Sequence, residues 1–410
     1  MDFKNKNFKK IKLLKSISYV AISKLVIILS QFFFIISFAK ILSVEDLGIY
    51  ALALSIISPI VWALTFDVPI KIISNSLETK NLFIILFPHI LILSLLSSGI
   101  FLMSVILTEV PIFYFLLLLL LPFKIGEIIS EIDNANLRRE EKFIYFSLVS
   151  SIRFFTIYVF GAIVIIYGYQ VVTCVTVLLI ISIIFALWSL YRLVKRGFYF
   201  KLNISDIMPY VNRNINLGIA SGIKFLSSNI MRYFIAFQFG ISTLGYTVPI
   251  FYGLTVLASI STIFENIFSP KILKRMDKGN KLLIDSNKKE ITILLLVSIF
   301  IIIFASLLSD YYYSFFFSEN KENYHYLLIT FSAGWFFFTS RSILKVISYK
   351  LKLQYLQIKI QFIFIFIMSV LMYVLSLFYG ILGITIAFVI SNVVICVYYI
   401  FNISKVNHKL

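Results

Sequence analysis

Five lysines and arginines lie inside long apolar stretches of the sequence, where a charged side chain requires an explanation. A cation at the centre of a membrane helix costs about 2.5–3.5 kcal/mol on insertion scales. Such residues are therefore expected to face a water-filled cavity, to pair with an acid or to contact a substrate. The five positions are Lys24, Lys124, Arg153, Lys224 and Arg232.

Two of these cations share one apolar stretch. Lys224 and Arg232 are eight residues apart, which places them close to one face of a helix. Ser221, Ser228 and Asn229 fall on or beside that face. The five residues form a polar stripe that is predicted to face a water-filled cavity. For the serines alone, hydrogen bonding between packed helices would explain the pattern equally well.

The other three cations have different surroundings. Lys24 lies about a turn and a half from the expected cytoplasmic end of its span, so it could line the cavity or extend to the lipid headgroups. Arg153 lies about three turns inside its span, too deep to reach the headgroups easily, and is predicted to face the cavity. Lys124 has Glu127 three residues further on, a spacing that predicts an ion pair within the helix.

Acidic residues are few at membrane depth. Asp67 and Glu265 lie near the expected cytoplasmic ends of two spans. They could be counter-ions for the cavity cations, proton or sodium sites that couple transport, or solvated helix ends. His89 follows Pro88 and is interpreted as an interior histidine at a helix kink. The two cysteines lie in apolar runs, no metal or redox motif is present, and no cofactor is expected.

Composition defines the elements that must carry these residues. The 410 residues are 60% hydrophobic and 14% charged, whereas soluble domains average about 45–50% and about 25%. A helix needs about 20 apolar residues to cross the hydrocarbon core. The sequence therefore predicts an all-α integral membrane protein with about twelve spans. These are 17–39, 47–69, 82–107, 111–130, 143–167, 170–190, 216–239, 244–268, 291–309, 324–343, 355–379 and 381–402.

The distribution of charge predicts the orientation of these spans. With the N-terminus inside, 30 of the 37 Lys and Arg residues lie on the cytoplasmic side, and only Lys40 and Lys321 lie on the other. The cytoplasmic set includes Arg192, after the sixth span, and Arg341, after the tenth apolar run. By the positive-inside rule both termini are cytoplasmic. The net charge of +18 is then an orientation signal, and no nucleic-acid partner is expected.

A weak internal repeat divides the chain. The Leu-Gly pairs at 47–48 and 244–245 are separated by 197 residues, and each lies at the start of the second span of a six-span half. We expect two six-helix bundles, residues 1–200 and 201–410. Because six is an even number, both halves start on the same side and form a parallel repeat. Such repeats usually place a substrate site near the membrane midplane.

The charges and loops together favour a transporter over an enzyme. A basic cavity suits an anion, guanidinium groups suit phosphate oxygens, and 43 Phe and 24 Tyr could line an apolar tail. No Walker A sequence is present, so the chain carries no nucleotide motor of that kind. A glycan polymerase or ligase usually needs a sizeable external loop, and the largest one expected here, 310–322, is short.

Two segments resemble a known family. Leu42-Ser-Val-Glu-Asp-Leu-Gly-Ile-Tyr-Ala-Leu-Ala-Leu-Ser55 and Arg138-Arg-Glu-Glu-Lys-Phe-Ile-Tyr-Phe-Ser147 are similar to the corresponding segments of Wzx-type flippases for O-antigen and capsule repeat units. These polysaccharide transporters belong to the multidrug/oligosaccharidyl-lipid/polysaccharide (MOP) exporter superfamily. The twelve-span layout in two halves matches over the whole chain.

The resemblance implies a MATE-like fold in a bacterial inner membrane. It also implies a flippase that moves an undecaprenyl-diphosphate-linked oligosaccharide from the cytoplasmic to the periplasmic leaflet by alternating access. The cations that would hold the substrate are Lys24, Arg153, Lys224 and Arg232. Membrane lipids, a polysaccharide polymerase and a chain-length regulator are the expected partners. The alternative is an ion-coupled cation or drug antiporter of the same fold, for which acids deep in the cavity are expected.

Overall fold

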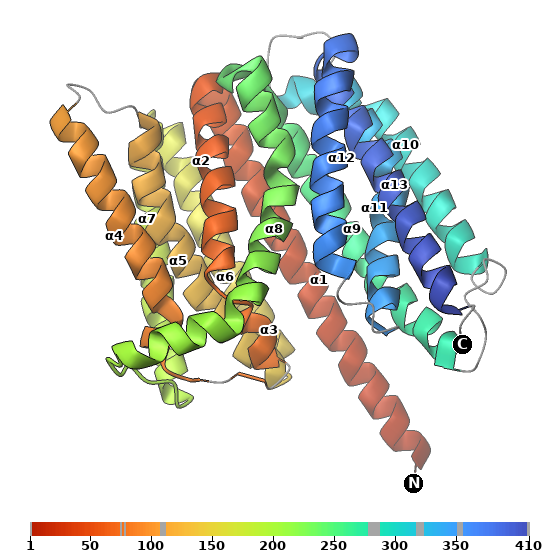
Figure 1. The fold of residues 1–410 in the computed structure, drawn as a ribbon, viewed down its shortest axis with the longest axis horizontal. Coiled ribbons are helices and arrows are strands. Elements are labelled where there is room, and N and C mark those ends of the chain that lie inside the picture. The colour runs from red at the N-terminus through yellow and green to blue at the C-terminus, as the bar shows by residue number, and fades with distance from the viewer. Residues whose placement is uncertain are drawn as a thin grey trace. The chain divides into compact units, whose positions relative to one another are not determined.

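The computed structural model describes residues 2–73, 76–77, 79–106, 112–277, 288–316, 324–350 and 356–407, which are almost entirely helical (Figure 1). In this part of the chain, eleven helices are long and apolar enough to cross a membrane, which confirms a multi-pass all-α membrane protein. The helices are α1 (Asp2–Ile41), α2 (Val44–Ala63), α3 (Val68–Ile73), α4 (Leu82–Ile106), α5 (Ile112–Arg139), α6 (Phe143–Ile166), α7 (Val171–Lys195), the 3-10 helix η1 (Ile204–Asp206), α8 (Ile207–Phe239), α9 (Ile241–Asp277), α10 (Lys288–Phe316), α11 (Tyr324–Lys350), α12 (Leu356–Tyr379) and α13 (Ile381–Asn407).

Local sequence explains where several helices begin and end. Ser43 caps α2 by accepting a hydrogen bond from the backbone N–H of Asp46, at 3.0 Å. Gly240 has a φ of +88° and lies between α8 and α9, and Gly380, with a φ of +56°, lies between α12 and α13. Glycine adopts this left-handed conformation without steric cost, so each pair of helices can follow directly one after the other.

The helices that carry the repeated Leu-Gly pair begin at equivalent points. α2 starts at Val44 and α9 at Ile241, which is again an offset of 197 residues. By compactness the chain separates into two units, Met1–Leu226 and Ser227–Leu410. The boundary between these units lies inside α8, and the two six-helix bundles, residues 1–200 and 201–410, stay a prediction.

Unit 1, Met1–Leu226, is built around α5 and α6. α5 lies against α2, α3, α4 and α7, and α1 packs along α6. Aromatic side chains fill the contact between α1 and its neighbours. The ring of Phe34 lies 5.9 Å from that of Tyr50 in α2 and 5.6 Å from that of Tyr158 in α6. Gln31 of α1 also donates to the Tyr158 hydroxyl, at 3.3 Å.

Unit 2, Ser227–Leu410, is built around α11, which packs on α9, α10 and α13, while α12 packs on α13. Trp335 of α11 is buried, and its indole nitrogen donates to the carbonyl of Leu257 in α9 at 2.9 Å. α10 has the most apolar span of the described chain, and large side chains such as Phe300, Phe304 and Leu307 are exposed. Such a surface is suited to contact with lipid.

Three features differ from the sequence predictions. α8 is not among the eleven apolar helices, although the sequence predicted a span at 216–239. α11 continues to Lys350, beyond the predicted end of its span at residue 343, so Arg341, which the charge count placed on the cytoplasmic side, lies well inside the apolar helix. α7 continues to Lys195, beyond the predicted end of its span at residue 190, so Arg192 also lies inside a helix. Lys321 and part of the predicted external segment 310–322 lie outside the described residues.

Candidate functional site

Arg153 of α6 lies at membrane depth in unit 1. It is ten residues from the start of the helix, about 15 Å along its axis. Its side chain is only 4% exposed, and Nε and Nη1 are buried without a hydrogen-bond partner among the described residues. The guanidinium carbon lies 4.3 Å from the ring centroid of Phe154. Glu127 and Glu131 of α5 interact with it electrostatically. Arg153 is thus a buried cation with unused donors and acids nearby.

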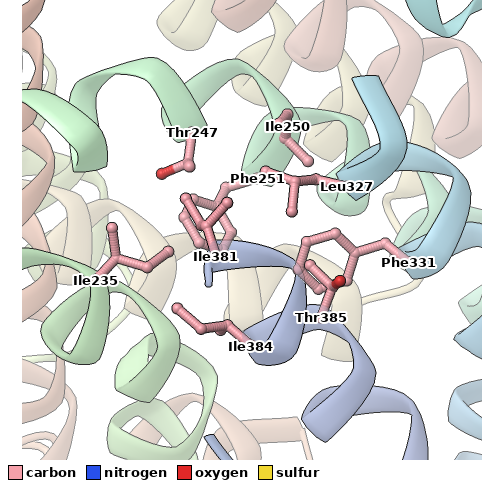
Figure 2. A pocket seen from close by; sticks show the side chains of 9 residues that line it. All are labelled: Ile235, Thr247, Ile250, Phe251, Leu327, Phe331, Ile381, Ile384 and Thr385. Atoms are coloured by element: carbon pink, nitrogen blue, oxygen red, sulfur yellow. The ribbon is translucent and has the colours of Figure 1, made fainter. Parts of the chain in front are cut away.

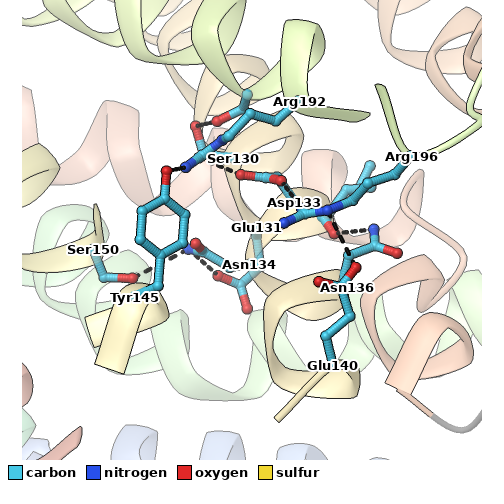
Figure 3. Close-up of polar contacts among 12 residues, drawn as sticks. Ser130, Glu131, Asp133, Asn134, Asn136, Glu140, Tyr145, Ser150, Arg192 and Arg196 are labelled. Carbon is cyan, nitrogen blue, oxygen red and sulfur yellow. Dashed lines mark hydrogen bonds and ion pairs between the residues drawn. The ribbon is translucent and has the colours of Figure 1, made fainter. Parts of the chain in front are cut away.

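A fully buried carboxylate joins α5 to α7 in the same unit (Figure 3). Asp133 is 0% exposed and forms ion pairs with both Arg192 and Arg196. Arg196 Nε also pairs with Glu140, at 3.2 Å. The two arginines are four residues apart, Arg192 in the last turn of α7 and Arg196 directly after it, so they lie on the same side at the end of the helix. With Glu140 included, two acids pair with two arginines, and this balance favours a structural role over substrate binding.

Two more ion pairs lie along α5. Lys124 Nζ lies 2.6 Å from Glu127, which confirms the ion pair expected from their spacing. Glu131 pairs with Arg138. These acids and bases of α5 therefore compensate one another, whereas no ion pair of the described residues includes Arg153.

The polar stripe of α8 is divided between the two units. Ser221 and Lys224 belong to unit 1, and Ser228, Asn229 and Arg232 belong to unit 2. Ser221 is buried and donates to Asp67, at 2.5 Å, so two residues predicted from separate spans lie together. The Lys224 side chain is exposed, with its Nζ 5.7 Å from the ring centroid of Phe225.

Asp67 lies in an unusual backbone segment. Phe66 and Asp67, between α2 and α3, have φ angles of +48° and +54°. A left-handed conformation in a residue other than glycine costs of order 1–3 kcal/mol, so the surrounding contacts must hold it. Ser221 holds Asp67, and Lys71 donates to Asn214 of α8. This bend therefore fixes α2 and α3 against the first half of α8.

Arg232 is the in-span cation of unit 2 that the sequence predicted. Its side chain is partly buried, and Nη1 donates to Asn229 one turn earlier, at 2.8 Å. The guanidinium carbon lies 5.0 Å from the ring centroid of Phe251 in α9. Nε is buried without a hydrogen-bond partner, and no carboxylate of the described chain forms an ion pair with Arg232.

Phe251 also lines a small apolar pocket of unit 2, shown in Figure 2. Thr247 and Thr385 supply its hydroxyl groups, and none of its lining side chains is charged. The pocket is suited to hydrocarbon and not to a charged group. Its lining residues are Ile235, Thr247, Ile250, Phe251, Leu327, Phe331, Ile381, Ile384 and Thr385.

Arg341 is a further in-span cation of unit 2 that sequence reasoning missed. Nη1 donates to Asn392 Oδ1 and Nη2 to Gln361 Oε1, each at 3.2 Å. The guanidinium carbon lies 4.0 Å from the ring centroid of Phe364. A signal was present in the sequence, because apolar residues continue beyond Arg341 through Ile347.

The other predicted residues differ in their exposure. Lys24 of α1 is exposed, and Glu265 of α9 is partly buried. His89 is 0% exposed, which confirms an interior histidine; Nε2 lies 3.1 Å from the carbonyl oxygen of Val61, and Nδ1 has no hydrogen-bond partner among the described residues. Within the described residues, no group of three or more His, Cys, Asp or Glu side chains could hold a metal ion.

Comparison with known proteins identifies the fold. No protein-family model and no curated protein sequence matches this chain. Among solved structures, the lipid II flippase MurJ in an inward closed conformation matches with a TM-score of 0.73 and 16% identity, over 94% of this chain and 87% of that one. A multidrug-resistance MATE transporter of the MOP superfamily matches in its inward-facing form with a TM-score of 0.59 and 14% identity, over 95% and 98%.

The outward-facing form of a MATE transporter gives the same TM-score of 0.59, at 17% identity, over 96% of each chain. Both kinds of neighbour are transporters, and the matches cover nearly the whole chain. The chain therefore has the MurJ/MATE-like fold that the sequence predicted.

Proposed function

We propose that this protein is a flippase for an oligosaccharide linked to undecaprenyl diphosphate, such as an O-antigen or capsule repeat unit. It moves the substrate from the cytoplasmic to the periplasmic leaflet of a bacterial inner membrane by alternating access. The observation that carries this proposal is a set of arginines at membrane depth with unused N–H donors, on a fold shared with a lipid II flippase. Arg153 and Arg232 each keep a buried nitrogen without a partner in the described chain.

The chemistry of these residues suits a diphosphate. A guanidinium group presents five N–H donors in a rigid fork that matches phosphate oxygens. Arg232 uses one donor within its own helix, and none of the ion pairs among the described residues includes it. Arg153 and the more accessible Lys24 and Lys224 would add positive charge. Asp67 and Glu265 remain proposed counter-ion or ion-coupling positions.

A deletion strain tests this proposal most directly. Deletion should remove surface glycan and leave single repeat units on undecaprenyl diphosphate facing the cytoplasm. Arg232→Ala and Lys224→Ala should each reduce glycan export at unchanged expression, whereas Lys405→Ala, an exposed cation of unit 2, should not. Normal export in the R232A/K224A double variant would contradict the assignment of these cations.

Two other results would redirect the proposal. Repeat units that reach the periplasm but remain unpolymerised would indicate that this protein is a membrane enzyme. In the flippase proposal, a polymerase and a chain-length regulator stay the expected partners. Unchanged glycan with altered sensitivity to cationic dyes would indicate an ion-coupled antiporter. The MATE-like fold supports that alternative equally, but the acids of α5 are paired with cations, which leaves little negative charge to bind a cationic drug.

A further inference from the structure

The Arg341 cluster connects three helices of unit 2. Arg341 of α11 donates to Gln361 of α12 and to Asn392 of α13. Gln361 Oε1 also accepts from Ser227, at 3.3 Å, and Asn392 is itself fixed by a bond from Nδ2 to the carbonyl of Phe388, at 2.8 Å. The guanidinium is thus held in position by two amide oxygens whose own positions are fixed.

The positive charge of Arg341 is not neutralised by this cluster. Both hydrogen-bond acceptors are neutral amides, and none of the ion pairs of the described residues includes Arg341. The ionisable groups that interact with it electrostatically are Tyr399 and Cys396, and neither is a carboxylate. Polar groups that only join helices do not need a full charge, so the cluster provides more than packing requires.

Several hydrogen-bond donors of the cluster remain available. An arginine has five N–H donors, and Arg341 uses two of them on the amide oxygens. Gln361 accepts through Oε1, and its Nε2 makes no hydrogen bond among the described residues. The unused N–H donors of Arg341 therefore belong to a cation that is held in position. Such a group can bind an oxyanion and would repel a cation.

The position of Arg341 argues against a lipid-facing role. It lies in the span Tyr326–Ser348 and is partly exposed. A guanidinium exposed to hydrocarbon would be costly at this depth, so its open side is expected to face water or a ligand. Phe364, which is 4% exposed, covers one face of the guanidinium and leaves its edges for hydrogen bonding.

We infer that Arg341, oriented by Asn392 and assisted by Gln361, is an oxyanion-binding group of unit 2 that contacts a phosphate of the lipid-linked substrate. This inference rests on the proposed flippase function for the identity of the ligand. Charge-assisted hydrogen bonds to phosphate oxygens supply the binding energy, and the fixed guanidinium limits the entropy lost on binding. A carboxylate of an acidic sugar shares this chemistry and is separated from phosphate by the choice of probes.

The test adds a carboxylate beside Arg341 without removing the arginine. Gln361→Glu keeps the size and position of the side chain and gives Arg341 a counter-ion. Binding of undecaprenyl diphosphate to the full-length protein is measured in maltoside micelles, which contain no phosphate. Undecaprenol, inorganic pyrophosphate and glucuronate are the comparison probes, and Lys405→Gln removes an exposed cation stacked on Phe401 in the same unit.

Q361E should weaken undecaprenyl diphosphate binding by about 10- to 100-fold, the range expected for one charge-assisted contact. Its unfolding midpoint should stay the same or rise, since an ion pair replaces a neutral contact. Arg341→Lys keeps the charge but loses the fork, and a smaller loss is expected. K405Q should bind as the wild type does.

Each outcome bears on a separate claim. Unchanged binding in both Q361E and R341K would overturn the anion-binding role and leave Arg341 as a link between helices. A wild type that binds undecaprenyl diphosphate no better than undecaprenol would contradict the flippase proposal. Pyrophosphate binding weakened by Q361E would still support an anion site in that case. If Q361E weakened the binding of glucuronate and the protein did not bind pyrophosphate, phosphate would be excluded as the ligand.

Discussion

The cations of the two units differ in the groups that they contact. In unit 1, Asp133 lies between Arg192 and Arg196, and the ion pairs of α5 compensate Lys124 and Arg138. In unit 2, Arg232 and Arg341 are held by neutral amides and aromatic rings, and the ion pairs of the described chain include neither. Similar helical frameworks therefore contain different electrostatics.

This difference separates a structural use of charge from a binding use. A buried ion pair gains little net stability, but removing one partner is costly because the other charge is left behind. A cation held by neutral groups has its full charge available for a ligand. We therefore propose a structural role for the ion-paired charges of unit 1 and anion attraction for Arg232 and Arg341 of unit 2. Arg153 has features of both uses, because acids interact with it but two of its nitrogens make no hydrogen bond among the described residues.

Asp133→Asn should have the largest effect on stability. It would leave Arg192 and Arg196 side by side without their shared buried carboxylate. Breaking a buried ion pair in this way costs about 3–5 kcal/mol. The free energy of unfolding, measured by SDS titration in mixed micelles, should fall by that amount, and little folded protein should be recovered.

The matched control is Asp206→Asn, which alters an exposed acid that accepts a hydrogen bond from Asn203. Surface changes of this kind usually stay within about 0.5 kcal/mol. If D133N and D206N were equally stable, the buried cluster would contribute no more to the free energy of unfolding than an exposed acid does. The distinction between the units would then be lost.

Arg232→Gln should have a much smaller effect on stability than D133N. Arg232 makes one hydrogen bond within its own helix, its Nε is unsatisfied, and its removal leaves no carboxylate behind. We expect a loss below about 1 kcal/mol in the same SDS titration, together with a clear loss of glycan export. A loss of several kcal/mol would instead mean that Arg232 is part of the scaffold.

Much of the fold follows from local sequence. Runs of apolar residues indicate the spans, and the Lys124–Glu127 pair follows from a spacing of three residues on one helix. α8 was harder to define, since Lys224 and Arg232 make its second half more polar. Its apolar residues predict a span at 216–239, but α8 is not among the helices that are apolar enough to cross a membrane.

The missed features depend on contacts distant in sequence. Asp133 lies 59 residues from Arg192, and no local pattern pairs them, although the i,i+4 spacing of Arg192 and Arg196 indicates a shared face. The charge count places Arg341 on the cytoplasmic side, near the end of the predicted span 324–343. Only the continuation of α11 to Lys350 places it among amides of α12 and α13.

The smallest predicted effect concerns Glu140, which lies just beyond α5 and pairs with Lys142 at 2.8 Å and with Arg196 at 3.2 Å. Burial alone would raise the pKa of Glu140, but the hydrogen bond with Lys142 and the charge of Arg196 outweigh it and hold that pKa below its usual value of 4.5. An acid with a lowered folded-state pKa stabilises the fold above its unfolded-state pKa and loses that contribution as the pH falls through the folded-state value.

Glu140→Gln should therefore reduce the free energy of unfolding by less than about 1 kcal/mol at pH 7, since the pair is partly exposed. The difference from the wild type should close as the pH falls below 4.5. The measurement is an SDS titration of both proteins from pH 7 to pH 3. A gap that persists at pH 3 would show that the Glu140 contribution is not ionic, which would weaken the view that balanced charge stabilises unit 1. R232Q offers the contrast, because no carboxylate pairs with Arg232 in the described chain, and its difference from the wild type should not vary over this range.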